Sequence, residues 1–241
     1  MRSDGRESNE LRTVEIIPHY TKWAEGSVLV KFGDTQVLCT VTIDDRLPRW
    51  LHKSDDSHGW VSAEYGMLPR SCDKRAVRER QFLRGRTQEI ERLIGRSLRM
   101  GVDLRRLGMR QLLVDCDVIQ ADGGTRTAAI TGSWVAMQLA LWPLIEDGKM
   151  SKKVFKHQVA AVSVGMVNGV PLLDLAYDED SAADADINVV MTGTGEFIEV
   201  QGTGENAPFD RKQLSNLLDL AEHGCNQLLA IQSDLIDNLQ F

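Results

Sequence analysis

The sequence predicts a single folded domain over residues 1–241, of the α+β or α/β class. Two observations carry this prediction. β-Rich hairpin patterns occur at residues 26–43 and 159–175, and helical patterns lie between and after them. No Pro- or Ser-rich linker divides the chain, whose length suits one domain or two small halves packed together. The similarity of the two hairpin regions also predicts an internal duplication.

The first expected element is the hairpin at residues 26–43. Two runs rich in Val, Leu and Thr flank Gly33-Asp34, a residue pair that is typical of tight hairpin turns. Residues 44–59 follow the hairpin and are rich in Asp, Ser and His. We expect this stretch to form a mobile loop.

An amphipathic helix is predicted over residues 87–102. Its apolar residues recur at helical spacing and are expected to face the core: Ile90, Leu93, Ile94, Leu98 and Val102. Arg92, Arg96 and Arg99 are spaced i, i+4 and i+7, so they form one stripe on the opposite face.

A strand is predicted at residues 112–119, because apolar residues alternate there with Asp115 and Asp117. Residues 128–141 are apolar almost all round, which indicates a buried helix. The second hairpin turns at Asn168-Gly169, and a last helix is expected over residues 210–236.

The segment between this strand and the buried helix has the features of a phosphate-binding loop. Gly123 and Gly124 let the backbone approach an anion, Thr125 and Thr127 supply hydroxyl groups, and Arg126 adds a guanidinium. The first amides of a helix lack internal partners and lie at the positive end of its dipole. A plain Gly-Gly turn capped by Thr127 is the alternative. The P-loop and Rossmann signatures are absent from the sequence.

Six carboxylates occur within residues 174–186: Asp174, Asp178, Glu179, Asp180, Asp184 and Asp186. Such carboxylates repel one another unless a cation or an arginine lies near. Hard oxygen ligands suit Mg²⁺ or Mn²⁺. A solvated acidic loop is the alternative.

Charge is unevenly distributed along the chain. The net charge is −7, yet residues 70–110 hold twelve Arg and one Lys against five acids, a local charge of +8. Arginine offers a planar fork that matches phosphate geometry, so we interpret this block as phosphate- or nucleic-acid-binding. A salt-bridged, solvated helical face is the alternative. Together, the arginine block, the loop and the carboxylates are the parts of a phosphoryl-transfer site.

Other classes are poorly supported. Hydrophobic residues make up 42% and charged residues 26%, which argues against a disordered or fibrous protein. The four cysteines lie far apart and the five histidines show no metal spacing. Residues 1–7 are polar, unlike a signal peptide, and we count no apolar run of the ~18 residues that a membrane span needs. We therefore expect a cytoplasmic protein with reduced thiols and no membrane partner.

These motifs resemble the ribonuclease PH family, whose bacterial members are phosphate-dependent 3′→5′ exoribonucleases that trim tRNA precursors. The resemblance covers nearly the whole chain, at residues 20–22, 24–30, 32–35, 63–70, 85–90, 115–118, 120–127, 179–183, 186–191 and 198–203. It implies a ribosomal protein S5 domain 2-like α+β fold, with two β-sheet/helix halves in one domain. It also implies a homohexameric ring built as a trimer of dimers.

The resemblance implies roles for particular residues. Inorganic phosphate, the co-substrate, is expected at Arg86, Gly124, Thr125 and Arg126, and Arg126 is also expected to be catalytic. Asp180 and Asp186 are expected to be the catalytic pair that binds Mg²⁺ or Mn²⁺. Contacts to RNA, chiefly tRNA precursors, are expected from six arginines: Arg70, Arg75 and Arg78 by resemblance, and Arg92, Arg96 and Arg99 from the charged stripe.

Two further points follow from the resemblance. Residues 79–84 depart from the family pattern, which bears on RNA contact more than on the chemistry. The alternative function is that of a non-catalytic RNA-binding subunit of an exosome-like ring. Such subunits are expected to lose the phosphate loop or the aspartate pair, and this chain has both, so the sequence favours an enzyme.

Overall fold

A computed structural model describes residues 2–51, 58–79 and 84–239. The elements in chain order are β1 (Val14–Pro18), β2 (Gly26–Phe32), β3 (Thr35–Asp44), β4 (Trp60–Met67), α1 (Gly85–Gly101), α2 (Leu104–Leu107), β5 (Gln111–Gln120), α3 (Thr125–Glu146), the 3₁₀ helix η1 (Lys152–Val154), β6 (Val159–Val167), β7 (Val170–Leu173), α4 (Tyr177–Ala182), β8 (Ala185–Thr192), β9 (Phe197–Gly204) and α5 (Arg211–Asn238).

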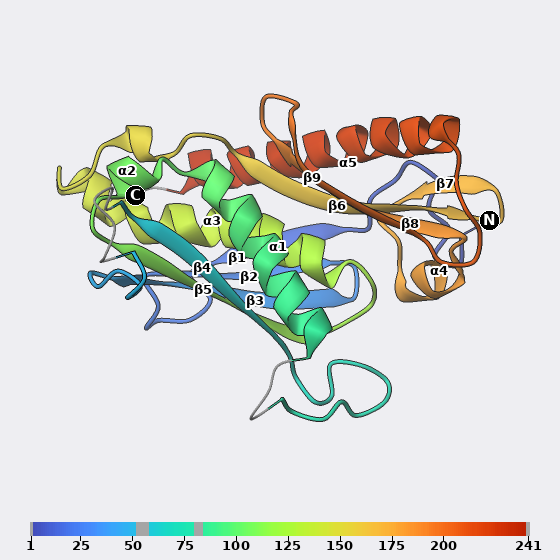
Figure 1. Cartoon of the computed structure of the whole chain (residues 1–241), viewed down its shortest axis with the longest axis horizontal. Helices are drawn as coiled ribbons and strands as arrows, with labels where there is room; N and C mark the ends of the chain where they lie inside the picture. The colour runs from blue at the N-terminus through green and yellow to red at the C-terminus, as the bar shows by residue number, and fades with distance from the viewer. Residues whose placement is uncertain (1, 52–57, 80–83, 240–241) are drawn as a thin grey trace.

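The strands form two sheets with helices between and outside them (Figure 1). The first sheet has the order β1-β2-β3-β5-β4, with β4 parallel to β5 and the other pairs antiparallel. The second is antiparallel, in the order β7-β6-β8-β9. Helix α3 packs on β2 and β3 of one sheet and on β6 of the other, while α5 covers the outer face of the second sheet. Because α3 lies between two sheets, it is apolar on all sides.

The structure confirms the expected α+β class, both hairpins and the three main helices. The first hairpin closes between Phe32 and Thr35, and the second between Val167 and Val170. In the second turn Asn168 and Gly169 both have positive φ, as a type I′ turn requires. Helix α5 begins after Asp210, whose carboxylate accepts a hydrogen bond from the backbone N–H of Gln213 at 2.8 Å.

Several elements are absent from the sequence prediction. Strand β4 has mixed composition and gains its strand geometry by pairing with β5. Strand β9 is largely exposed and forms the edge of the second sheet, so it lacks a strong apolar pattern. The expected loop at 44–59 lies partly outside the described residues, as does most of the atypical segment 79–84.

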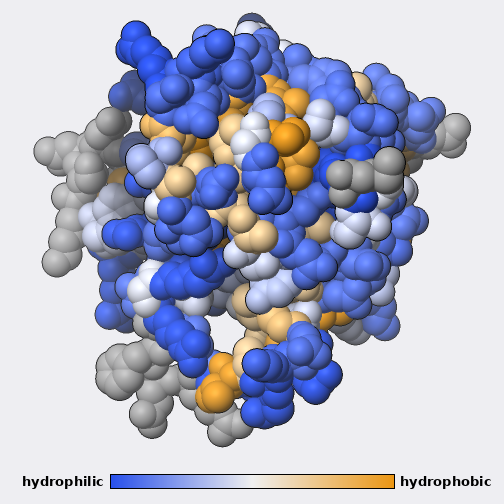
Figure 2. Space-filling model, turned by 90° about the vertical axis from the view of Figure 1, so that its right-hand side faces the viewer, coloured by the Kyte–Doolittle hydropathy of each residue, from blue (hydrophilic) through white to orange (hydrophobic). Residues whose placement is uncertain are grey.

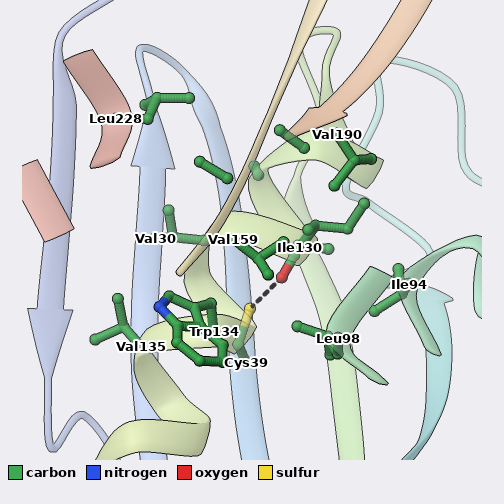
Figure 3. Close-up of a cluster of buried hydrophobic side chains, with 14 of the residues drawn as sticks. Val30, Cys39, Ile94, Leu98, Ile130, Trp134, Val135, Val159, Val190 and Leu228 are labelled. Atoms are coloured by element: carbon green, nitrogen blue, oxygen red, sulfur yellow. Dashed lines mark hydrogen bonds between the residues drawn. The ribbon is translucent and has the colours of Figure 1, made fainter. Parts of the chain in front are cut away.

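One hydrophobic core runs through both sheets. Trp134 of α3 is the largest of its fully buried side chains, and the Cys39 thiol on β3 donates to the Ala129 carbonyl at 3.6 Å. Figure 3 shows side chains from both sheets and three helices meeting there: Val30, Cys39, Ile94, Leu98, Ile130, Trp134, Val135, Val159, Val190 and Leu228. The two halves therefore share their packing.

Helix α3 is long and apolar enough, by length and composition, to cross a membrane. The sequence prediction identified no apolar run of that length. However, 78% of its apolar window is buried inside the protein. A core helix between two sheets is also apolar along its whole length, because each of its faces packs against apolar side chains.

The contact between α1 and α3 leaves no room for a methyl group at Gly101. A Cβ there would lie 2.5 Å from Cζ3 of Trp134. We expect Gly101→Ala to lower the free energy of unfolding by about 1–3 kcal/mol, measured by urea denaturation. Gly85→Ala in the same helix is the control, because a Cβ at Gly85 meets no atom within 4 Å. Equal urea midpoints for the two variants would contradict this packing.

Candidate active site

The expected strand, glycine turn and helix are present. Strand β5 ends at Gln120, and Gly123 and Gly124 then adopt φ values of 73° and 64° before α3 starts. These left-handed values favour glycine. Gly123 also approaches the chain after β7 so closely that a Cβ there would lie 2.4 Å from the Leu175 carbonyl oxygen. The glycine loop therefore lies directly against the segment that leads into α4.

The start of α3 is held by buried polar contacts. The Thr125 hydroxyl is 2.8 Å from the hydroxyl of Tyr65, which lies on β4. Thr127 turns back and donates to the Gly124 carbonyl at 2.9 Å. No side chain caps α3 at Gly124, so its first amides keep the anion-binding potential of a helix N-terminus.

Arg126 bridges the two halves of the protein. Its Nη1 donates to Gln201 on β9 at 2.7 Å and to Glu89 on α1 at 3.2 Å. Gln201 also donates to Glu89 at 2.7 Å, which closes a three-membered network. Both contacts of Arg126 use Nη1. In the described part of the chain Nε and Nη2 have no partner, so they remain for a ligand.

Asp180 and Asp186 come from α4 and β8, and their charges interact. Burial is the main cause that raises the pKa of each, and the charge of Asp180 raises the pKa of Asp186 further. Glu205, after β9, adds to the repulsion on both. A bound cation would relieve this repulsion.

Arg86 and Arg126 lie in the neighbourhood of these aspartates. Burial raises the pKa of Asp180, and the charges of both arginines oppose that increase. Burial likewise raises the pKa of the Tyr65 hydroxyl, and the charges of the same two arginines oppose that increase. Arg86 lies exposed in the first turn of α1. The loop, both arginines and both aspartates thus occupy one end of the molecule.

The other carboxylates of the acidic stretch behave differently. Asp174 is fully buried and accepts from Arg12 at 2.7 and 2.9 Å, while Glu179 accepts from Arg2 at 2.7 Å on both oxygens. Asp178 is exposed and Asp184 is half-buried. N-terminal arginines thus neutralise the deepest acids, and Asp180 and Asp186 are left for the site.

Two carboxylates suit a particular kind of metal binding. Within the described residues, no group of three or more His, Cys, Asp or Glu side chains could hold an ion. Mg²⁺ commonly takes one or two carboxylates and completes its shell with water and substrate phosphates. The donor set of Asp180 and Asp186 fits that mode and does not fit a closed, all-protein cage.

The arginines expected to contact RNA have different surroundings. Arg70, Arg75 and Arg78 are exposed on residues 68–79, the segment after β4 that projects from the body of the molecule (Figure 1). Arg92 is exposed on α1, and Arg96 pairs with Glu199 at 2.6 Å. Arg99 donates to the Val61 carbonyl at 2.8 Å and stacks over Trp60, about 20 Å along the helix from Arg86. Arg99 therefore has a structural role, and its contact with RNA stays a prediction.

Sequence reasoning assigned no role to four residues that shape the site: Arg12, Tyr65, Glu89 and Gln201. The last three fall inside motifs that resemble the ribonuclease PH family, and that was the available signal. Their partners lie 37 or more residues away in the sequence, so local patterns could not pair them.

The surface at this end of the molecule is mostly hydrophilic, with smaller hydrophobic areas (Figure 2). A polar surface of this kind suits a charged substrate better than an apolar one.

Comparison with known families decides the assignment. Domain 1 of the 3′ exoribonuclease family matches residues 10–143, and domain 2 of that family matches residues 157–224. The chain belongs to the 3′ exoribonuclease family. The segment matched by domain 1 contains Arg86 and the glycine loop, and the segment matched by domain 2 contains Asp180 and Asp186. The candidate site of this family member therefore forms where the two segments meet.

Solved structures of family relatives share the fold. Rice (Oryza sativa) Rrp46 has a TM-score of 0.77 at 18% identity, with 98% of both chains covered. The Archaeoglobus fulgidus exosome with RNA bound to the active site has a TM-score of 0.77 at 25% identity, covering 94% of this chain and 91% of that one. An archaeal exosome core has a TM-score of 0.73 at 24% identity, with 96% and 91% covered. The expected S5 domain 2-like fold is thereby confirmed.

The raised pKa values have a consequence for stability. Between its unfolded and folded pKa, a carboxyl such as Asp180 binds more protons in the folded protein, so the free energy of unfolding falls as pH rises through that window. At neutral pH and without divalent ions, we expect Asp180→Asn to unfold at the same or a higher Tm than the unsubstituted protein. The difference should shrink as pH falls into the carboxyl titration range.

Thermal unfolding followed by circular dichroism at several pH values measures this effect. Asp178→Asn is the control, because that acid is exposed on the same helix. A clearly lower Tm for Asp180→Asn at neutral pH would show that Asp180 stabilises the fold, contrary to this account.

Proposed function

We propose that this chain is a phosphate-dependent 3′→5′ exoribonuclease of the bacterial ribonuclease PH type, acting on the 3′ ends of tRNA precursors and other RNA. It releases nucleoside 5′-diphosphates, and in reverse it adds nucleotides. One observation carries the proposal: a glycine loop at a helix N-terminus, two arginines and a pair of repelling aspartates meet at one end of the molecule.

In this proposal, orthophosphate is the nucleophile. The amides of Gly124 and Thr125 and the Nε and Nη2 groups of Arg126 would hold it, and exposed Arg86 would contact it from α1. Fixing the nucleophile in line with the last phosphodiester converts a chance encounter into an intramolecular event. The bond to the 3′-oxygen breaks as the new phosphoanhydride forms. Because a phosphodiester is exchanged for a phosphoanhydride and no linkage is lost to water, the reaction is expected to be readily reversible.

Asp180 and Asp186 are the residues that would hold Mg²⁺ or Mn²⁺. When bound, the ion offsets charge on the leaving 3′-oxygen and on the equatorial phosphate oxygens. The ion would also relieve the repulsion between the two carboxylates, which burial intensifies. Arg126 is kept in place by Glu89 and Gln201, so its guanidinium would be oriented before substrate arrives.

The proposed assembly is a homohexameric ring built as a trimer of dimers. In it, the exposed arginines at 70, 75 and 78 would guide RNA toward the site. The similarity to exosome structures supports an RNA-binding ring in general. The homohexamer and the choice of tRNA precursors rest on the sequence resemblance.

A non-catalytic, RNA-binding ring subunit is the second candidate. The similarity to rice Rrp46 and to two exosome structures favours it, because one fold can host proteins with different functions. Against it, this chain keeps both the loop and the aspartate pair, and neither is needed merely to bind RNA. We therefore favour the enzyme.

The nucleophile distinguishes the candidates. End-labelled RNA with Mg²⁺ should be shortened only when inorganic phosphate is present, and the released product should be a nucleoside diphosphate. Monophosphate release without phosphate would indicate hydrolysis, and no release would indicate a binding subunit.

Arg126→Ala should lower kcat/KM for phosphate-dependent release by about 10²-fold or more, because it removes a preorganised positive charge. Gln201→Ala is the matched control. It removes one partner of Arg126 but keeps the guanidinium and its contact with Glu89, so a much smaller loss is expected. A folded Arg126→Ala protein with normal turnover would overturn the role of Arg126.

Mg²⁺ should raise the Tm of the unsubstituted protein, since a ligand that binds the folded state stabilises it. This increase should disappear in Asp180→Asn and in Asp186→Asn, together with Mg²⁺-dependent turnover. Affinity for RNA, measured by fluorescence anisotropy, should persist in both variants. If either variant kept the full Mg²⁺-induced increase in Tm, the assignment of the metal ligands would fail.

RNA affinity should fall steeply with salt, because arginines that neutralise phosphates release counterions. Replacing Arg70, Arg75 and Arg78 together by Gln should reduce the slope of log affinity against log salt by about two to three. An unchanged slope would show that these three arginines do not contact RNA phosphates.

A further inference from the structure

Arg12 lies directly behind the glycine loop and is almost completely buried, with its side chain 4% exposed. Its guanidinium donates to the carbonyl oxygens of Asp122 and Gly123, in the latter case at 3.5 Å. It also donates to both carboxylate oxygens of Asp174, at 2.7 and 2.9 Å. The guanidinium thus ties the loop to the end of β7.

Thr35 strengthens the same arrangement. Its hydroxyl donates to the Gly123 carbonyl at 2.6 Å and accepts from the Asp122 amide at 2.9 Å. The carbonyls of Asp122 and Gly123 are therefore both occupied on the buried side of the loop. A trans peptide unit points its carbonyl and its N–H in opposite directions. Because these two carbonyls are hydrogen-bonded on the buried side of the loop, the N–H groups of Gly123 and Gly124 point away from that side.

Gly124 lies close to this guanidinium. A Cβ at Gly124 would be 3.0 Å from Nη2 of Arg12 and 3.3 Å from the Thr127 hydroxyl oxygen. The buried guanidinium thus contacts the loop from its inner side.

The carboxylate side is anchored by the same N-terminal segment. Arg2 makes two hydrogen bonds to Glu179, which immediately precedes Asp180 in α4, and it also donates to the Asp174 carbonyl at 3.1 Å. Residues 2–12 therefore connect both parts of the site.

We infer that Arg12 is a positioning residue for the phosphate nucleophile. By holding the two loop carbonyls, it orients the Gly124 amide that is proposed to bind orthophosphate and fixes the distance of this amide from the aspartate pair, and it acts through the loop without touching the anion. This inference deepens the proposed function and rests on it. It assigns to residues 2–12 a part in binding phosphate.

The test must separate positioning from stability, because removing Arg12 alone leaves the Asp174 carboxylate buried without its main partner. The double variant Arg12→Met with Asp174→Asn removes both charges together. We expect it to fold and to show a KM for phosphate raised about tenfold or more, with the KM for RNA changed far less. Arg46→Met is the control, since that arginine pairs with Asp44 at an exposed position.

A folded double variant with an unchanged KM for phosphate would overturn the inference. If the double variant does not fold, Arg12→Lys is measured in its place. Lysine keeps the charge opposite Asp174, but its compact ammonium cannot reproduce the fork that bonds both carboxylate oxygens and both loop carbonyls. An unchanged KM for phosphate in Arg12→Lys would likewise overturn it.

Calorimetric titration with inorganic phosphate separates this inference from the proposed function. Weaker phosphate binding in the variants supports the role of Arg12 even if the unsubstituted protein releases monophosphates, a result that would refute phosphorolysis. An unsubstituted protein that binds no phosphate would overturn both.

Discussion

The candidate site depends on a close approach between two backbone segments that are distant in the sequence. The glycine loop after β5 lies against the chain after β7, and only a residue without a Cβ fits at Gly123. The buried pair of Arg12 and Asp174 spans the same contact. Separating the two segments would leave a buried charge without its partner, which is strongly destabilising. The pair therefore favours the observed arrangement of the two segments.

Charge is distributed between the two halves in a way that follows from this contact. The first half contributes the cations Arg86 and Arg126, and the second half contributes Asp180 and Asp186. Burial and mutual repulsion disfavour the ionised aspartates, while the arginines partly compensate. In the proposed function, the arginines would attract a phosphate and the repelling aspartates would attract a divalent ion. Functional sites commonly retain such locally unfavourable interactions at a cost in stability.

The fold alone does not decide the chemistry. Family membership and the similarity to exosome structures establish the architecture of this chain, and related subunits with one fold can differ in activity. The proposed phosphorolysis therefore depends on side chains at one end of the molecule. The hydrogen bonds among Arg126, Glu89 and Gln201 link the two halves and orient the guanidinium of Arg126.

The sequence by itself determined the local structure. The hairpin turns at Gly33-Asp34 and Asn168-Gly169, the α1 stripe and the strand-loop-helix unit at 112–141 depend on neighbours within a few residues, so periodicity and turn chemistry could predict them. The tertiary structure decided which polar groups meet. Six acids in the stretch 174–186 are indistinguishable by spacing, but the tertiary structure brings Arg2 and Arg12 onto two of them and leaves Asp180 and Asp186 within the electrostatic influence of Arg126. Pairings of this kind join residues more than a hundred positions apart, where no local pattern carries information.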